Sequence, residues 1–490
     1  MKRYTRRVAA VLMAVIMVMT MGMLSACSKS YEHTFGEVEW LSTYAEEAGT
    51  TIKDSYYYSD GWFETKPETE NKELALASMQ LTAAAVSNDA DGMGAKFLKD
   101  MGFDKVGFSD FESKDPDDFN YTYGIRELES GDRIVAVAIQ STSADHAVKA
   151  KGWRQNFMVN DPDSKDPAGE HYAFAKAADS KLDAIAALGD GSDGAVKYWI
   201  TGQSRGGAIA NILAKRLGDK FAGTGNSVYA YTFEAPATVD DASAGGRDYN
   251  FIHNYACSDD LVTKVPAWGM TLYGVTHDLK TDKTDEGMTA ELEAMGSEAA
   301  DFRSRILVED DVAAIVAGFE KKIPTRADYS ASRTDKWTDA SGQSHELTYT
   351  YQDAMTKFAG LISGGESGFE ISSLAGSRSE LEGSIDHLKE GVKLEAAGND
   401  PCTEYWEGAA GLYEQMQAAA GEGGLGLTQE DVYEIVNVAA PVFIQIPEDG
   451  GEPDISLLTD AIGYSEDLIY SHQFDTIIAR LKVMAPTPDK

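Results

Sequence analysis

The sequence VKYWITGQSRGGAIANILAKRL, residues 196–217, joins an aromatic and β-branched run to a helical pattern through a glycine-rich turn. Its first six residues are typical of a buried strand. Residues 207–217 carry apolar side chains at helical spacing. Between the two patterns lies a single hydroxyl, that of Ser204, flanked by Gly202 and Gly206. The stretch therefore predicts a strand, a sharp turn that presents one serine, and a helix.

The segments around this stretch alternate between strand and helix patterns. The expected strands are RIVAVAI (133–139), VKYWIT (196–201), SVYAYTFEAP (227–236) and one within NFIHNYACSDDLVTKVP (250–266); the expected helices lie over about 70–100, 171–189 and 207–217. Such alternation predicts an α/β fold, a mostly parallel sheet with helices on both faces. Parallel sheets of this kind carry their chemistry at the carboxyl ends of the strands, and Ser204 lies at such an end.

The composition of the sequence changes over residues 283–460, which are acidic, rich in glycine and mainly helical in pattern. We interpret this segment as a large helical insertion, a candidate lid, in a single α/β domain over 51–490. Residues 27–50 are interpreted as a tether that leads into this domain.

The formal net charge of −37 on 490 residues excludes some partners. A surface this acidic repels the phosphate backbone of nucleic acids and anionic lipid headgroups alike. Nucleic acid is therefore not an expected partner, and charge alone does not bring the protein to a membrane. The oligomeric state stays open.

The N-terminus supplies another route to a membrane. Four basic residues precede an apolar run over residues 8–24, and the run closes with Leu-Ser-Ala-Cys. This pattern is typical of a secretory signal, here residues 1–26. Its end resembles the lipobox of bacterial lipoproteins, which implies cleavage before Cys27, a lipid on its sulfur and anchoring outside the cytoplasm. The alternatives are an ordinary secretory signal and a short transmembrane anchor.

Export would permit a disulfide between the two remaining cysteines, Cys257 and Cys402. They are far apart in the sequence, and we expect two separate thiols. The acidic loop DPDSKDPAGE, residues 161–170, lacks the full ligand spacing of a calcium loop, so no metal and no organic cofactor is expected.

Ser204 lies in a G-x-S-x-G pattern between a strand and a helix. In that context the pattern is typical of a nucleophile, because glycines two residues before and after the serine let strand and helix approach closely. The alternative is a serine that only shapes the turn. A serine hydroxyl needs a base, usually a histidine oriented by a carboxylate. In this kind of fold the order along the chain is serine, acid, histidine.

Two adjacent carboxylates, Asp259 and Asp260, follow an expected strand downstream of the serine and are candidates for the acid. The candidate bases are His277, His345, His387 and His472. His345 and His387 lie in polar sequence within the insertion. His472 opens the last amphipathic segment, where the base of such folds lies, and we prefer it to His277, which ends an apparent strand.

With these residues in place, the chain resembles the fungal-type (class 3) lipases over about residues 55–280 and the last thirty. YWITGQSRGGAIANILA resembles the family's nucleophile turn, with Gln203 where histidine is usual. VYAYTFEAPA resembles the strand Tyr-Thr-Phe-x-x-Pro. NYACSDDLVTKVP resembles Asn-x-x-Asp-x-Val-x-x-x-Pro and implies that Asp260 is the acid. IYSHQFDTIIARL is similar to the terminal histidine segment and implies that His472 is the base.

The resemblance also implies an oxyanion hole made by the backbone amides of Thr142 and Arg205. The family has Arg-Gly-Thr or Arg-Gly-Ser at the first donor, whereas this chain has Gln140-Ser141-Thr142, without the glycine. Loss of one donor typically costs about a hundredfold to a thousandfold in rate. His171 resembles a family histidine that we interpret as structural.

Together these features predict a serine hydrolase that cleaves carboxylic esters or lipids through Ser204, His472 and Asp260. The alternative is a lipoprotein on a degenerate hydrolase fold, weak or inactive in catalysis, that acts as a binding or scaffold protein. Acyl transfer and amide cleavage use the same residues and also stay open.

Overall fold

The computed structural model describes residues 32–42, 50–85, 92–109, 118–141, 153–164, 168–240, 249–279, 284–297, 309–362, 378–420, 425–447, 451–457 and 467–484. At its centre is a seven-stranded sheet in the order β11-β9-β7-β6-β5-β4-β3. Strands β5, β6, β7, β9 and β11 run parallel to one another. Strand β4 pairs antiparallel with both β5 and β3. Their bounds are β3 (Lys105–Phe108), β4 (Tyr121–Glu127), β5 (Arg133–Ile139), β6 (Val196–Gln203), β7 (Ser227–Phe233), β9 (Ile252–Ala256) and β11 (Val275–Asp278). The predicted α/β class is confirmed.

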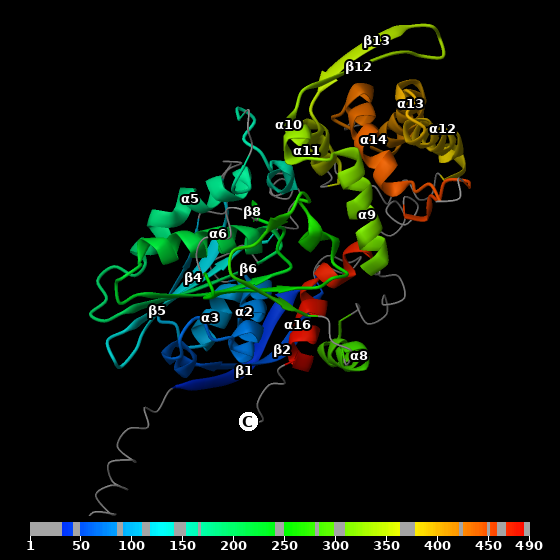
Figure 1. Ribbon diagram of the computed structural model, residues 1–490. Coiled ribbons are helices and arrows are strands. Elements are labelled where there is room, and N and C mark those ends of the chain that lie inside the picture. Colours follow the sequence, from blue (N-terminus) through cyan, green and yellow to red (C-terminus); the bar gives the residue numbers. More distant parts are fainter. Residues whose placement is uncertain are drawn as a thin grey trace, which may run out of the picture.

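Helices cover both faces of the sheet (Figure 1). Val135 and Val137 of β5 pack toward α5 and α6, whereas Ala136 and Ala138 pack toward the opposite layer. Both faces of β5 are therefore buried, which explains its continuous apolar run. The covering helices are α5 (Tyr172–Ala187) and α6 (Arg205–Lys220) on one face, and α2 (Lys72–Ala84), α3 (Met93–Asp100) and α16 (Phe474–Met484) on the other.

A hairpin of β1 (His33–Leu41) and β2 (Thr51–Ser59) adds to the layer of α2 and α16. Trp40 of β1 is fully buried, and its indole Nε1 donates to Asp475 Oδ1 of α16 at 2.7 Å. The interpretation of residues 27–50 as a tether is therefore wrong for β1. The partner that buries Trp40 lies 435 positions away in the sequence, so the local pattern gave no sign of it.

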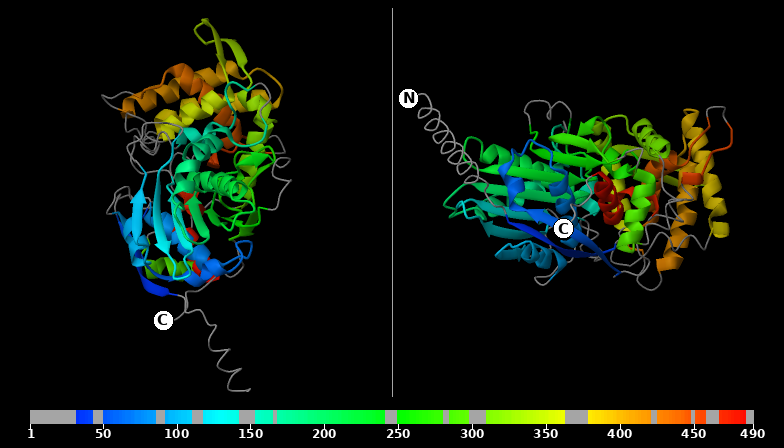
Figure 2. Two further views of the ribbon diagram at one scale, coloured as in Figure 1. Left: turned by 90° about the vertical axis from the view of Figure 1, so that its left-hand side faces the viewer. Right: turned by 90° about the horizontal axis from the view of Figure 1, so that it is seen from below.

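The insertion contributes two parts. Helix α8 (Thr284–Met295) packs against α16. The rest, the described residues between 309 and 457, forms a region that we call the cap, which lies at one end of the sheet and has its own hydrophobic core (Figures 1 and 2). The cap contains α9 (Glu309–Lys322), α10 (Arg326–Ser330), β12 (Arg333–Thr338), β13 (Ser344–Tyr349), α11 (Tyr351–Ile362), α12 (Arg378–Ala396), α13 (Cys402–Ala420) and α14 (Gln429–Phe443). It is mainly helical as predicted, and the β12–β13 hairpin was not predicted.

Across the part of the chain that the structure describes, no helix combines the length and the apolar character that crossing a membrane requires. The predicted signal segment and Cys27 lie outside the described residues. Cys257 and Cys402 are buried free thiols, one after β9 in the sheet and one at the start of α13 in the cap.

Candidate active site

Ser204 occupies the turn between β6 and α6 with φ 56° and ψ −131°. This left-handed backbone is strained for a serine, and such strain persists where the surrounding structure over-determines it. Two backbone hydrogen bonds hold the turn: Ser204 N donates to Phe233 O at 2.9 Å, and Ala208 N donates to Ser204 O at 3.0 Å. The turn has the conformation of a nucleophile elbow.

The glycines around Ser204 are required by close backbone approach. A Cβ on Gly202 would lie 2.4 Å from the carbonyl oxygen of Gly206. A Cβ on Gly206 would lie 2.7 Å from Ile139 O and 2.8 Å from Gln140 O. Glycine at these two positions therefore lets β6, α6 and the end of β5 converge on the serine.

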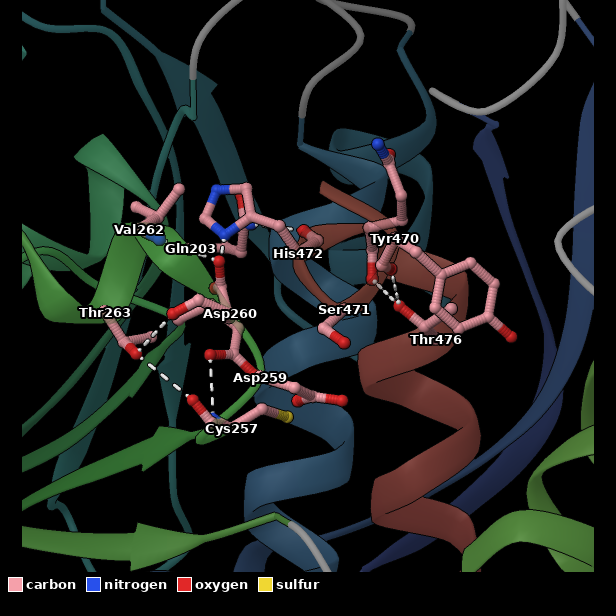
Figure 3. A network of polar contacts seen from close by, with 12 residues as sticks. Gln203, Cys257, Asp259, Asp260, Val262, Thr263, Tyr470, Ser471, His472 and Thr476 are labelled. Carbon is pink, nitrogen blue, oxygen red and sulfur yellow. Dashed lines mark hydrogen bonds and ion pairs between the residues drawn. The ribbon is translucent and has the colours of Figure 1, made fainter. Parts of the chain in front are cut away.

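Asp260 and His472 meet across 212 positions of sequence (Figure 3). His472 ends the 3-10 helix η7 (Asp467–His472), and its Nδ1 lies 2.7 Å from Asp260 Oδ2. Asp260 is almost fully buried, and its Oδ1 accepts a hydrogen bond from Val262 N at 2.9 Å. A carboxylate at Nδ1 selects the tautomer that carries a proton there, which leaves Nε2 as the acceptor.

Gln203, directly before Ser204, ties this pair to the elbow. Its Nε2 donates to the backbone oxygen of His472 at 2.8 Å, and its Oε1 accepts from Ser141 Oγ at 2.8 Å. Among the described residues no hydrogen bond joins Ser204 Oγ to the His472 ring. In unliganded enzymes this contact is often long and tightens when substrate binds.

The other candidate residues have different partners. Asp259 forms an ion pair with Arg480 of α16 at 3.1 Å. His277 lies within β11, not at its end, with its Nε2 3.0 Å from His253 Nδ1. His345 and His387 lie in the cap and pair with Asp339 and Glu404. Of the two aspartates and four histidines, the geometry thus brings together Asp260 and His472.

The candidate oxyanion residues are only partly described. Thr142 lies outside the described residues, and Arg205 is the first residue of α6, so its backbone amide belongs to the first turn of the helix. The fully buried guanidinium of Arg205 donates to Gln155 Oε1 at 2.7 Å and to the carbonyls of Gln140 and Ser141 at 3.4 Å. Burial lowers the pKa of Arg205 to about 10, so the group stays charged at neutral pH.

Sequence reasoning missed these side-chain roles of Gln203 and Arg205. A charged side chain after a turn is usually exposed to solvent, and only the folded structure shows that the Arg205 side chain is buried. His171 was interpreted as structural; it is fully buried, stacks on Phe174 and lies 3.2 Å from Asn156 O.

Residues 147–270 match the family described as Lipase (class 3). This segment contains the elbow and both candidate aspartates, whereas His472 lies outside it. No curated protein matches the chain.

Among solved structures, a lipase from Rhizopus microsporus var. chinensis is similar with 18% identity over 44% of this chain and 77% of that one, at a TM-score of 0.29. The Rhizomucor miehei triacylglyceride lipase is 17% identical over 43% of this chain and 78% of that one, with a TM-score of 0.29. The Lip2 lipase from Yarrowia lipolytica is 14% identical over 45% of this chain and 79% of that one, with a TM-score of 0.27. With the family match around the elbow and the parallel sheet that carries it, the chain is a lipase-like α/β-hydrolase in fold.

Proposed function

We propose that the protein hydrolyses carboxylic esters with Ser204 as nucleophile, His472 as base and Asp260 as the acid of the triad. His472 Nε2 takes the proton of Ser204, whose oxygen attacks the ester carbonyl. The amides of Thr142 and Arg205 stabilise the oxyanion. His472 then returns the proton to the departing alcohol, and water, activated by the same ring, releases the acid from the acyl-enzyme.

The observation that carries this proposal is the 2.7 Å contact between His472 Nδ1 and Asp260 Oδ2 beside the strained turn of Ser204. Gln203 joins the two, because it precedes the serine and holds the His472 backbone. A turn that served packing alone would have no need of an enclosed histidine–carboxylate pair next to a strained serine.

A fluorophosphonate probe tests the nucleophile directly. We expect the purified protein to be labelled, and Ser204→Ala to lose the label completely. Ser227→Ala, a serine at the start of β7, is the matched control and keeps it. Well-folded wild-type protein that takes no label would overturn the proposal and favour the binding or scaffold lipoprotein.

The substrate class follows from a series of p-nitrophenyl esters of increasing acyl length, with and without micelles. Helix α9 of the cap packs against the segment after Asp260: Leu261 contacts the apolar cluster that holds Val312 and Ile315. We therefore propose that the cap lies over the route to the site and acts as a lid. Long-chain preference with activation at an interface is expected for a lipase. Short-chain preference without activation would identify an esterase.

We also propose that the protein is anchored outside the cytoplasm through a lipid on Cys27. The support is the basic and apolar N-terminal run ending in Leu-Ser-Ala-Cys. Wild-type protein in a bacterial host should incorporate labelled palmitate and sediment with membranes, and Cys27→Ala should do neither. Membrane association of Cys27→Ala without the label would favour the uncleaved anchor.

A further inference from the structure

Glu234 occupies an unusual position directly after β7. It is fully buried, and its backbone has φ 44°, a left-handed value that favours glycine. Its backbone N donates to Tyr255 O at 2.8 Å, which fixes it beside the end of β9. Both the left-handed backbone of a residue other than glycine and the burial of a carboxyl group cost free energy, so the position of this side chain needs an explanation.

The carboxyl of Glu234 faces the loop that carries Asp260. Its Oε2 accepts from Cys257 N at 3.0 Å, and its Oε1 meets no donor among the described residues. The Asp260 carboxyl is the charged neighbour that acts on the Glu234 carboxyl. Two ionised carboxylates are both acceptors, so a hydrogen bond between them requires that one carries a proton.

The charges around the pair indicate which carboxyl is protonated. Arg480 is the cation nearby, and its guanidinium pairs with Asp259 through two contacts of 3.3 and 3.1 Å. Asp260 accepts from Val262 N through Oδ1 and lies 2.7 Å from His472 Nδ1 through Oδ2, so each of its oxygens has a donor.

Glu234 lacks such support. Burial and the adjacent Asp260 carboxylate raise the pKa of Glu234 well above its usual range. Burial, together with Glu234, likewise raises the pKa of the Cys257 thiol, so this neighbour is neutral. The proton therefore belongs on Glu234.

We propose that Glu234 keeps its proton at neutral pH and donates it in a hydrogen bond to Asp260, so that the acid of the triad is a carboxyl pair with one negative charge. Glu234 is then a positioning residue that acts through Asp260. With Val262 N it holds the Asp260 carboxylate so that Oδ2 meets His472, and it moderates the negative charge that the imidazole faces. The inference rests on the proposed triad for its catalytic consequence and on the contacts of Glu234 for the proton itself.

Infrared difference spectroscopy at neutral pH tests the proton without reference to activity. Subtracting Glu234→Gln from the wild type should reveal the carbonyl stretch of a protonated carboxylic acid. Glu170→Gln is the matched control, because Glu170 is ion-paired with Arg216, which lowers its pKa, and should lose carboxylate bands instead. Loss of carboxylate bands in Glu234→Gln would overturn the proposal.

The pH profile of kcat/KM on a p-nitrophenyl ester tests the positioning role. Glutamine keeps an acceptor toward Cys257 N and a donor toward Asp260, so Glu234→Gln should stay within about twofold of the wild type. Glu234→Gly fits the left-handed turn and removes the donor; it should lose about tenfold in kcat/KM, the size of one hydrogen bond to a charged group. The acid limb of its pH profile should move to higher pH, because Asp260 then presents its full charge to His472.

If Glu234 only fills space, both variants will keep the acid limb of the wild type, and the positioning role is wrong. Hydrolysis by the wild type that survives Ser204→Ala would instead refute the proposed function. In that case the infrared result still decides whether Glu234 carries the proton.

Discussion

In the central sheet, β5 and β6 are buried along their whole length between two hydrophobic layers, whereas the cap has a cluster of aromatic rings around a buried carboxylate. Trp337 stacks on Tyr433 with ring centroids 4.6 Å apart, and Asp335 accepts from the hydroxyls of Tyr349 and Tyr433 at 2.8 and 3.0 Å. Each region thus encloses an aspartate, Asp260 at the sheet and Asp335 in the cap, and the two carboxylates have different hydrogen-bond partners.

The partners of the two aspartates indicate different roles, one in stability and one in the proposed chemistry. Asp335 has two tyrosine hydroxyls as donors and Arg333 at 3.1 Å, so it holds the cap together. Asp260 lies at the carboxyl end of the sheet and meets a histidine whose second nitrogen stays available. Burial of a carboxylate therefore does not mark a catalytic group; the nature of its partner does.

The largest effect should come from exchanging the two carboxylates for amides. Asp260→Asn should lower kcat/KM by about ten-thousandfold, because asparagine favours the wrong tautomer of the base. Asp335→Asn should keep kcat/KM within about twofold and lower the free energy of unfolding by roughly 1–3 kcal/mol. Steady-state kinetics and urea unfolding measure the two. Comparable loss of activity in both variants would mean that the regions are not separate in function.

The tight elbow and an open cap helix offer a contrast in glycine substitutions. Gly202→Ala places a Cβ 2.4 Å from a backbone oxygen and should cost about 3 kcal/mol or more of stability. Gly383→Ala in α12 meets nothing within 4 Å and should stabilise the cap by up to about 1 kcal/mol. Thermal unfolding of both variants checks this. A Gly202→Ala protein with wild-type stability would contradict the close approach.

Arg326 of the cap makes polar contacts across the seam between sheet and cap. Its guanidinium donates to the carbonyls of Val159, Gly169 and Glu170 at 2.9–3.0 Å. Arg326→Ala leaves these acceptors without their donor and should cost about 2–3 kcal/mol. Hydrogen exchange should show faster opening in the cap and unchanged protection in β5 and β6. Equal loss of protection in both regions would show that they unfold as one unit.

Another effect concerns the pH dependence of stability at the same seam. Burial lowers the pKa of His171 to about 3, whereas the unfolded chain titrates near 6.5. The stability from neutral His171 is complete above pH 6.5 and decreases as pH falls toward 3, because the unfolded chain then binds a proton that the folded protein does not. The loss should reach about 2 kcal/mol by about pH 5.

His171→Phe keeps the stacking on Phe174 and removes the titrating group. Urea unfolding from pH 7 to pH 5 should therefore give a flatter dependence for this variant than for the wild type. The same slope in both proteins would show that His171 does not carry the effect.

Local patterns predicted much of the fold. The run RIVAVAI appears as β5 with the predicted bounds, and the alternation of strands and helices appears as the doubly covered sheet. The elbow around Ser204 was predictable because its glycines and its flanking strand and helix are contiguous. The β1 strand was missed, because the contacts that bury Trp40 come from the other end of the chain.

The sequence by itself determined the order of serine, aspartates and histidine and the strained turn at the first of them, since these depend on neighbouring residues. The place of His472 near the end of the chain and the resemblance around Asp260 already favoured these two residues, but only the tertiary structure shows that their side chains meet, and only it encloses Glu234 beside the loop that carries Asp260. The physical reason is distance along the chain. Which carboxyl faces which imidazole depends on how α16 packs on the sheet, and no local pattern encodes that packing.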